Sequence, residues 1–138
     1  MKLFLDANVI YSAAKSESGA SYGIFQLKDK LKIKLVSSRL ALVETERNIS
    51  EKEDSRVVER FYKLIKAITI VSIESSKAKR FYGQTIEEKD APILFGAKQI
   101  KADFLITLDK RHFFTEKMRK AKFPFKIMTP GQFIMSLK

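Results

Sequence analysis

The sequence predicts an α/β layer fold with a mostly parallel sheet of about five strands. Two short apolar runs, residues 2–5 and 104–108, are too short for core helices and too uniformly apolar for strands exposed on one face. Each run is followed by an aspartate. Longer segments in which apolar residues recur at helical spacing lie between the strand signals. This alternation predicts helices packed on a parallel sheet.

Turn and capping residues divide the chain into its expected elements. Asp6 or Asn8 can cap the first helix, and Gly83 ends a later one. Thr129 and Pro130 begin the last helix as its cap and first residue. The expected strands are residues 2–5, 33–36, 68–73, 104–109 and 125–128. The expected helices are residues 8–15, 20–31, 39–49, 52–66, 75–82, 90–101 and a last one from 130, with a partly helical basic stretch up to residue 122.

The composition excludes several kinds of protein and site. The 138 residues are expected to form one domain, residues 1–138. The chain has no cysteine, which excludes disulfides and zinc–thiolate sites, and its one histidine, His112, excludes a multi-histidine cluster. No apolar run approaches the roughly 18 residues of a membrane span, and the N-terminus lacks a signal-peptide pattern. We therefore expect a cytoplasmic protein with no membrane partner.

The charge is strongly positive, with 27 Lys and Arg against 16 Asp and Glu and a formal net charge of +11. Such a surplus favours a polyanionic partner, nucleic acid first, although a solvated surface is the alternative. A basic stretch follows Asp109 and includes Lys110 and Arg111, which can bind backbone phosphates if the stretch lines a site. His112 can touch a phosphate there, but a lone loop histidine is more often an ordinary surface residue.

Four acidic residues fall at the ends of predicted elements on one side of the sheet. Asp6 and Asp109 each follow a strand. Glu44 lies on the helix after the second strand, and Asp90 opens the helix before the fourth. The carboxyl ends of parallel strands share one edge, so these carboxylates can meet, and a divalent cation such as Mg²⁺ would offset their repulsion. Structural alternatives remain: a helix cap for Asp6 or Asp90, a turn for Asp109, and an ion pair between Glu44 and Arg47.

These motifs, in this order, resemble the PIN-domain family, metal-dependent ribonucleases that include the toxins of VapBC-type toxin–antitoxin pairs. The first motif is LDANVI at residues 5–10, and the last is residues 102–109, where Thr107 and Asp109 match a Thr-x-Asp element. Glu44 resembles the family's glutamate, and DAPIL from Asp90 resembles its third acid. The resemblance covers essentially the whole chain.

The resemblance implies a three-layer α/β/α sandwich with a parallel, five-stranded sheet. It also implies hydrolysis of RNA by a water molecule that Mg²⁺ or Mn²⁺ activates. Asp6, Glu44 and Asp90 would be the principal metal ligands, and Asp109 would complete the catalytic set. The chain would then be a PIN-like nuclease and a toxin, paired in a homodimer and bound by a cognate antitoxin protein.

The resemblance also assigns supporting roles. Asn8 and Thr107 would hydrogen-bond to the ligands or the substrate, and Glu46 is the second choice for the role of Glu44. Two other classes compete with the enzyme: a non-catalytic basic RNA-binding module and a protein-interaction module of the same fold. A haloacid-type phosphatase would need an aspartate where Asn8 stands. The phosphate-binding glycine loops and the G-x-S-x-G elbow are absent.

Overall fold

The computed structural model describes residues 1–138 and contains one five-stranded sheet. All neighbouring strands are parallel, in the order β3-β2-β1-β4-β5. The chain builds from β1 outward to β3 and then returns to place β4 on the other side of β1. The strand order therefore reverses between β1 and β4, the position at which open α/β sheets bind ligands. The strands are β1 (Lys2–Leu5), β2 (Lys34–Ser38), β3 (Ile68–Val71), β4 (Phe104–Ile106) and β5 (Lys126–Met128).

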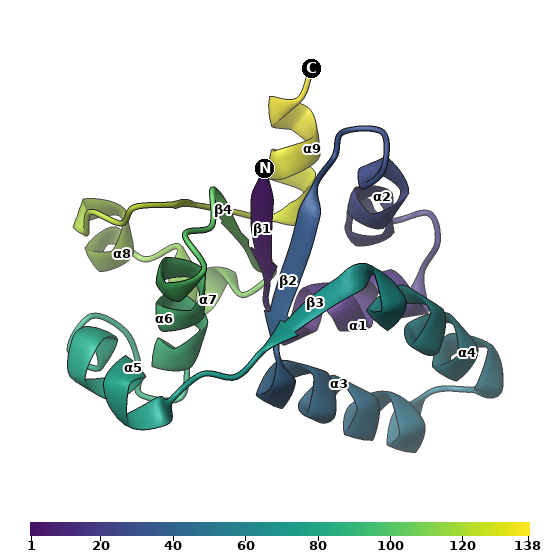
Figure 1. Ribbon diagram of the computed structural model, residues 1–138, viewed down its shortest axis with the longest axis horizontal. Coiled ribbons are helices and arrows are strands. Elements are labelled where there is room, and N and C mark those ends of the chain that lie inside the picture. Colours follow the sequence, from purple (N-terminus) through teal and green to yellow (C-terminus); the bar gives the residue numbers. More distant parts are fainter.

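Helices cover both faces of the sheet, which gives three layers (Figure 1). One layer contains α1 (Ala7–Lys15), α2 (Ala20–Leu27), α3 (Arg39–Lys52), α4 (Ser55–Leu64) and α9 (Pro130–Ser136). The other contains α5 (Ser75–Tyr82), α6 (Ala91–Gln99), α7 (Lys110–Phe113) and α8 (Glu116–Lys120). A short 3₁₀ turn, η1 (Ile65–Ala67), joins α4 to β3. The α/β/α sandwich with a parallel, five-stranded sheet is thus confirmed.

Alternate residues of each strand supply two separate cores. Leu3 and Leu5 of β1 pack with α1, α2, α3, α4 and α9, whereas Phe4 packs with the helices of the opposite layer. All three side chains are fully buried. Because helices cover both faces, β1 from Leu3 to Leu5 and all of β4 are apolar instead of alternating with polar residues.

Gly96 allows α6 to lie close against the central strand. A Cβ atom at Gly96 would lie 2.6 Å from Cζ of Phe4 and would also overlap the side chain of Ile73. The close packing of α6 holds the N-terminal end of this helix beside the sheet. Asp90 directly precedes that end.

Some helix boundaries differ from those expected from the sequence. α2 ends at Leu27 instead of residue 31, and the following turns lead to Lys32, whose φ of 53° is left-handed. α4 begins at Ser55 instead of residue 52, because the side chain of Asp54 accepts hydrogen bonds from the first turn of this helix. Local turn chemistry, which apolar periodicity does not report, sets these boundaries.

The region after β4 also differs from its expected form. β4 ends at Ile106 instead of residue 109, because Asp109 caps a new helix, α7. The basic stretch that follows forms two short helices, α7 and α8, and so is partly helical as expected. Thr129 caps α9 with Pro130 as the first residue, as predicted, and Gln132 completes a capping box. No helix in the structure has the length and apolar character needed to cross a membrane.

Candidate active site

Asp6 lies where β1 ends and α1 begins, beside the reversal in strand order. It caps α1, because its Oδ1 accepts the Ala7 N–H over 2.8 Å. The residue is buried, with 9% of its surface exposed. Its second oxygen, Oδ2, accepts one hydrogen bond from a side chain of α1 and one from a side chain that follows β4. Capping therefore uses one carboxylate oxygen and leaves the other for a site.

Two polar side chains hold the second oxygen of Asp6. The Thr107 hydroxyl donates to it over 2.8 Å, and the Asn8 Nδ2 donates over 3.3 Å. Thr107 also accepts the Asp109 N–H, and Asn8 accepts the Leu108 N–H. Asn8 and Thr107 thus join the ends of β1 and β4 and fix the direction of the Asp6 carboxylate.

Asp109 follows β4 and begins α7. Its Oδ1 accepts the His112 N–H over 3.1 Å, and its Oδ2 lies 2.7 Å from Nδ1 of the same histidine. Asp109 is thus a helix cap, and its carboxylate also lies near Asp90, because the same Nδ1 of His112 is 3.7 Å from Oδ2 of Asp90.

Asp90 precedes α6 but does not cap it, since its side chain accepts no hydrogen bond from the helix. Its Oδ2 is buried and has no hydrogen-bond partner, although Nδ1 of His112 lies 3.7 Å away. A buried carboxylate oxygen without a partner costs free energy. This oxygen is available to a ligand.

Burial and mutual repulsion raise the pKa values of two carboxylates in this site. The pKa of Asp6 is raised to about 6, chiefly by burial and also by the charges of Asp90 and Asp109, while the hydrogen bonds from Thr107 and Ala7 oppose the rise. Burial also raises the pKa of Asp90, while His112 opposes that shift. A divalent cation would stabilise the charged forms of these acids.

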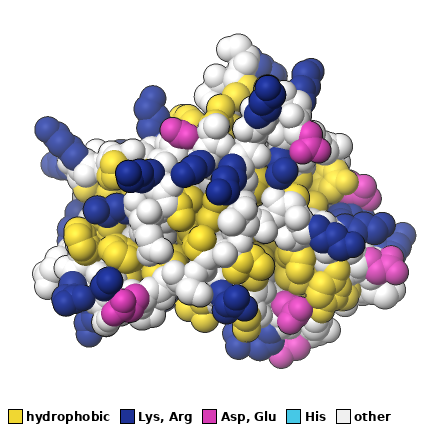
Figure 2. All heavy atoms as spheres, in the orientation of Figure 1, with side chains coloured by type: hydrophobic (Ala, Val, Ile, Leu, Met, Phe, Trp, Pro, Cys, Tyr) yellow, Lys and Arg dark blue, Asp and Glu magenta, His cyan; other side chains and the backbone are white.

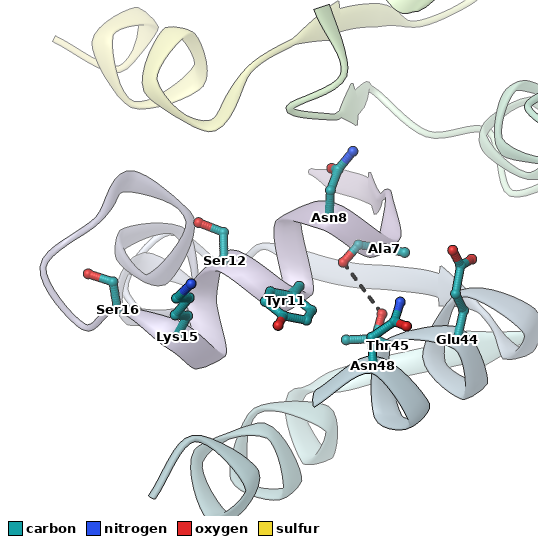
Figure 3. A pocket seen from close by; sticks show the side chains of 9 residues that line it. All are labelled: Ala7, Asn8, Tyr11, Ser12, Lys15, Ser16, Glu44, Thr45 and Asn48. Atoms are coloured by element: carbon teal, nitrogen blue, oxygen red, sulfur yellow. Dashed lines mark hydrogen bonds between the residues drawn. The ribbon is translucent and has the colours of Figure 1, made fainter. Parts of the chain in front are cut away.

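Glu44 lies further out, exposed on α3. It lines two adjoining pockets, one shared with Asp6 and one shared with Asn8. Figure 3 shows the second pocket, with Asn8 on α1 and Glu44 on α3, and with the Thr45 hydroxyl bonded to the Ala7 carbonyl between these helices. Glu44 forms no ion pair with Arg47 or any other residue.

Glu46, the second choice for the role of Glu44, faces a different neighbour. Its Oε2 accepts a hydrogen bond of 2.9 Å from the hydroxyl of Tyr62 on α4. Lys110 and Arg111 lie exposed on α7, next in the chain to Asp109, and form no ion pair with it. Both cations remain accessible to an anionic ligand.

His112 and Glu87 have a larger place in this site than the sequence indicates. His112 is on a helix, only 18% of its side chain is exposed, and it contacts Asp109, Asp90 and Glu87. Its pKa is raised, chiefly by the hydrogen bond with Asp109. In the sequence, Glu87 lies three residues before Asp90, and Asp109 lies three residues before His112. Side chains at this spacing lie on the same side of a helical turn, and this pattern could have indicated their contacts.

The residues present fit a divalent cation. The donors are mainly carboxylate oxygens, which hard cations prefer, and the Oδ2 of Asp90 lacks any other partner. Asp6, Asp90 and Asp109 could hold the ion, with Glu44 at the rim of the pocket. Glu87, Asp90 and His112 offer ligand atoms that lie within 4.8 Å of one another.

Solved structures with the same fold include two that are described as bound to DNA fragments. The chain is similar to a chain in the structure of VapBC2 from Rickettsia felis bound to a promoter DNA fragment, with 17% identity, a TM-score of 0.68 and coverage of 94% of this chain and 98% of that one. A chain in the structure of FitAB bound to the IR36 DNA fragment shares 18% identity, with a TM-score of 0.58 and coverage of 93% and 94%.

A third similar structure is that of PAE2754 from Pyrobaculum aerophilum. It shares 14% identity, with a TM-score of 0.68 and coverage of 99% of this chain and 95% of that one. Among curated proteins, no sequence matches the chain. The PIN-domain family model matches residues 2–111, which include the ends of β1 and β4 and all of the acids described above. The protein therefore belongs to the PIN-domain family.

Proposed function

We propose that this protein is a Mg²⁺- or Mn²⁺-dependent endoribonuclease and the toxin of a toxin–antitoxin pair. The observation that carries the proposal is the buried, unpartnered Oδ2 of Asp90, beside the carboxylates of Asp6 and Asp109 in a PIN domain. A cation bound to this oxygen would offset the cost of its burial. Asp6, Glu44, Asp90 and Asp109 are the proposed ligands.

The proposed reaction is hydrolysis of an RNA phosphodiester bond. The bound cation would polarise the phosphate and lower the pKa of a water molecule. Thr107 and Asn8 fix the Asp6 carboxylate so that it meets its ligand without reorganising. Lys110 and Arg111 would bind the flanking phosphates of the RNA without reading its bases.

The partners in this proposal are RNA, an antitoxin protein and a second copy of the chain. Two of the similar structures, VapBC2 and FitAB, are described as complexes with DNA fragments, and their fold extends over more than nine-tenths of this chain.

Leu40 and Val43 are exposed large apolar residues on α3, and they line the pocket that Asp6 also lines. Apolar side chains exposed beside a polar site are typical of a surface that a protein partner covers.

A non-catalytic RNA-binding module is the second candidate, and the net charge of +11 favours it. Figure 2 shows Lys and Arg side chains spread over one whole face, with fewer acidic side chains between them. A charge spread in this way would hold RNA whether or not the acids act on it. Binding alone therefore does not separate the two candidates, whereas metal-dependent cleavage does.

The test is cleavage of a labelled RNA in Mg²⁺ or Mn²⁺ and in EDTA. We expect cleavage by the wild-type protein with either metal, none in EDTA, and none by Asp90→Asn. Asp29→Asn is the matched control, because Asp29 is exposed and pairs only with Lys28. Cleavage that persists in EDTA would exclude the metal mechanism. RNA binding without cleavage in any metal would favour the binding module.

A further inference from the structure

The only histidine of the chain lies among three acidic residues. Nδ1 of His112 is 2.7 Å from Oδ2 of Asp109 and 3.7 Å from Oδ2 of Asp90, and its Nε2 is 3.5 Å from Oε1 of Glu87. These acids come from three places in the chain: the turn before α6, the residue that precedes α6, and the residue that begins α7. The imidazole therefore lies inside the acidic site and not on the open surface.

We propose that Nε2 of His112 and the carboxylate of Glu87 are ligands of the cation held at Asp90, and that this cation is a transition-metal ion. The inference rests on the proposed function, and it adds two ligands and a class of metal to it. The ligand atoms of Glu87, Asp90 and His112 all lie within 4.8 Å of one another. Donors about 2.1 Å from a shared ion are separated by roughly 3 to 4 Å, so small side-chain movements close this group around an ion.

The contacts of the imidazole decide which nitrogen faces the ion. At 2.7 Å the Nδ1 of His112 donates to Asp109, so the lone pair of a neutral ring is on Nε2, the atom that faces Glu87. A carboxylate that holds one ring nitrogen while the other binds metal is a recurrent arrangement in metalloproteins. The backbone supports it, because the His112 N–H also bonds to Asp109. In this arrangement Asp109, one of the proposed ligands, also fixes the orientation of the His112 ring.

A second observation points to an ion near His112. Oδ2 of Asp90 is buried without a hydrogen bond, even though the imidazole is its neighbour. The imidazole gives its short hydrogen bond to Asp109 instead, so it does not satisfy Asp90. An ion bound to Oδ2 of Asp90 and Nε2 of His112 satisfies both groups.

A nitrogen ligand changes which metal the site prefers. Imidazole suits later first-row ions such as Co²⁺ and Ni²⁺, and Mn²⁺ also accepts it, whereas Mg²⁺ takes oxygen ligands and keeps its waters. The wild-type protein should therefore bind Mn²⁺ more tightly than Mg²⁺, and Co²⁺ and Ni²⁺ more tightly still. Loss of the imidazole should reduce that preference.

The test uses Mn²⁺ as a spectroscopic probe on the full chain without a polyhistidine tag. Pulsed electron paramagnetic resonance should detect ¹⁴N coupling to bound Mn²⁺, and ¹⁵N labelling of histidine should convert that signal to ¹⁵N coupling. His112 is the only histidine, so the label assigns the signal without a mutation. Mn²⁺ bound with no histidine-nitrogen coupling would overturn the inference, and the proposed function would stand if Mn²⁺-dependent cleavage remained. Histidine coupling without cleavage in any metal would overturn the proposed function alone.

Variants test the two added ligands by calorimetry. His112→Asn can keep a donor near the Nδ1 position but lacks Nε2, and we expect Mn²⁺ affinity to fall about tenfold while Mg²⁺ affinity changes little. Glu87→Gln should also weaken Mn²⁺ binding, and Glu88→Gln should not, because Glu88 pairs with Lys79 instead of the histidine. Equal Mn²⁺ affinities for Glu87→Gln and Glu88→Gln would mean that Glu87 is not a ligand of the ion. The Glu87 and Glu88 variants change exposed residues, so their comparison holds even if His112→Asn does not fold.

Discussion

The hydroxyl of Thr107 donates a hydrogen bond of 2.8 Å to Oδ2 of Asp6, a residue 101 positions away in the chain. The same hydroxyl oxygen accepts the Asp109 N–H, so one side chain links two of the site's acids. Thr107 is fully buried. Its hydrogen bond lowers the pKa of Asp6 against the effect of burial. Thr107 thus helps to keep Asp6 charged and ready for a cation.

Replacing this threonine by valine tests the link. Thr107→Val should weaken divalent-metal binding, because the Asp6 pKa rises further when the hydrogen bond is lost. It should also lower the free energy of unfolding by about 1–3 kcal/mol, since the Asp109 N–H loses its acceptor. Calorimetry with Mn²⁺ and urea unfolding measure the two effects.

Thr45→Val is the matched control. Thr45 is also buried and donates to the Ala41 carbonyl over 2.7 Å, but it has no bond to an acid of the site. This variant should lose stability without losing metal affinity. Equal losses of metal affinity in both variants would mean that Thr107 acts only through the general stability of the fold.

The raised pKa of Asp6 predicts a dependence of stability on pH. The folded pKa is about 6 against an ordinary value of 3.8, so between these values the folded chain binds more protons than the unfolded chain. The free energy of unfolding should therefore fall as pH rises from about 4 to 6, by up to about 3 kcal/mol from this residue. Above about pH 6 the loss from Asp6 is complete.

Asp6→Asn isolates this contribution. Urea unfolding in EDTA at pH 4.5 and pH 7.5 should show the wild-type protein losing more stability than Asp6→Asn over this interval. Saturating Mn²⁺ should reduce the difference, because a cation favours the charged carboxylate. Parallel pH profiles for the two proteins in EDTA would mean that Asp6 has an ordinary pKa.

The close approach of Gly96 to Phe4 predicts that a side chain added at this position destabilises the fold. Gly96→Ala would bring a Cβ to 2.6 Å from the Phe4 ring, which forces α6 away from β1. We expect a loss of roughly 1–3 kcal/mol in the free energy of unfolding, as for other overpacked cores. Gly131→Ala is the control, since its nearest neighbour would be 4.0 Å away and its stability should change little.

The sequence predicted the sheet well because helices cover both of its faces. Continuous apolar runs such as the one from Leu3 to Leu5 follow directly from that burial, and their short length separates them from helices. The end of α2 was not predictable in this way. It depends on turns that lead to a left-handed Lys32, and apolar periodicity does not report them.

The sequence could predict the position of some residues of the site but not of others. Asp6 and Asp109 are fixed by the ends of two parallel strands, so adjacency in the sheet brings them together. His112 and Glu87 are not fixed by the sheet. Their contact depends on the one-turn helix α7 and on the path of the chain between α5 and α6, which pattern and spacing do not determine.

Glu44 and Glu46 form a matched pair for the last prediction. Both are exposed on α3, but Glu44 lines the pocket with Asp6, whereas Glu46 accepts a hydrogen bond from Tyr62. If Glu44 is a ligand, Glu44→Gln should lower Mn²⁺ affinity about tenfold or more and reduce RNA cleavage with it. Glu46→Gln keeps an acceptor for the Tyr62 hydroxyl and should leave both measurements unchanged. Should both variants bind Mn²⁺ as the wild-type protein does, the cation is held by Asp6, Asp90 and Asp109 without help from α3.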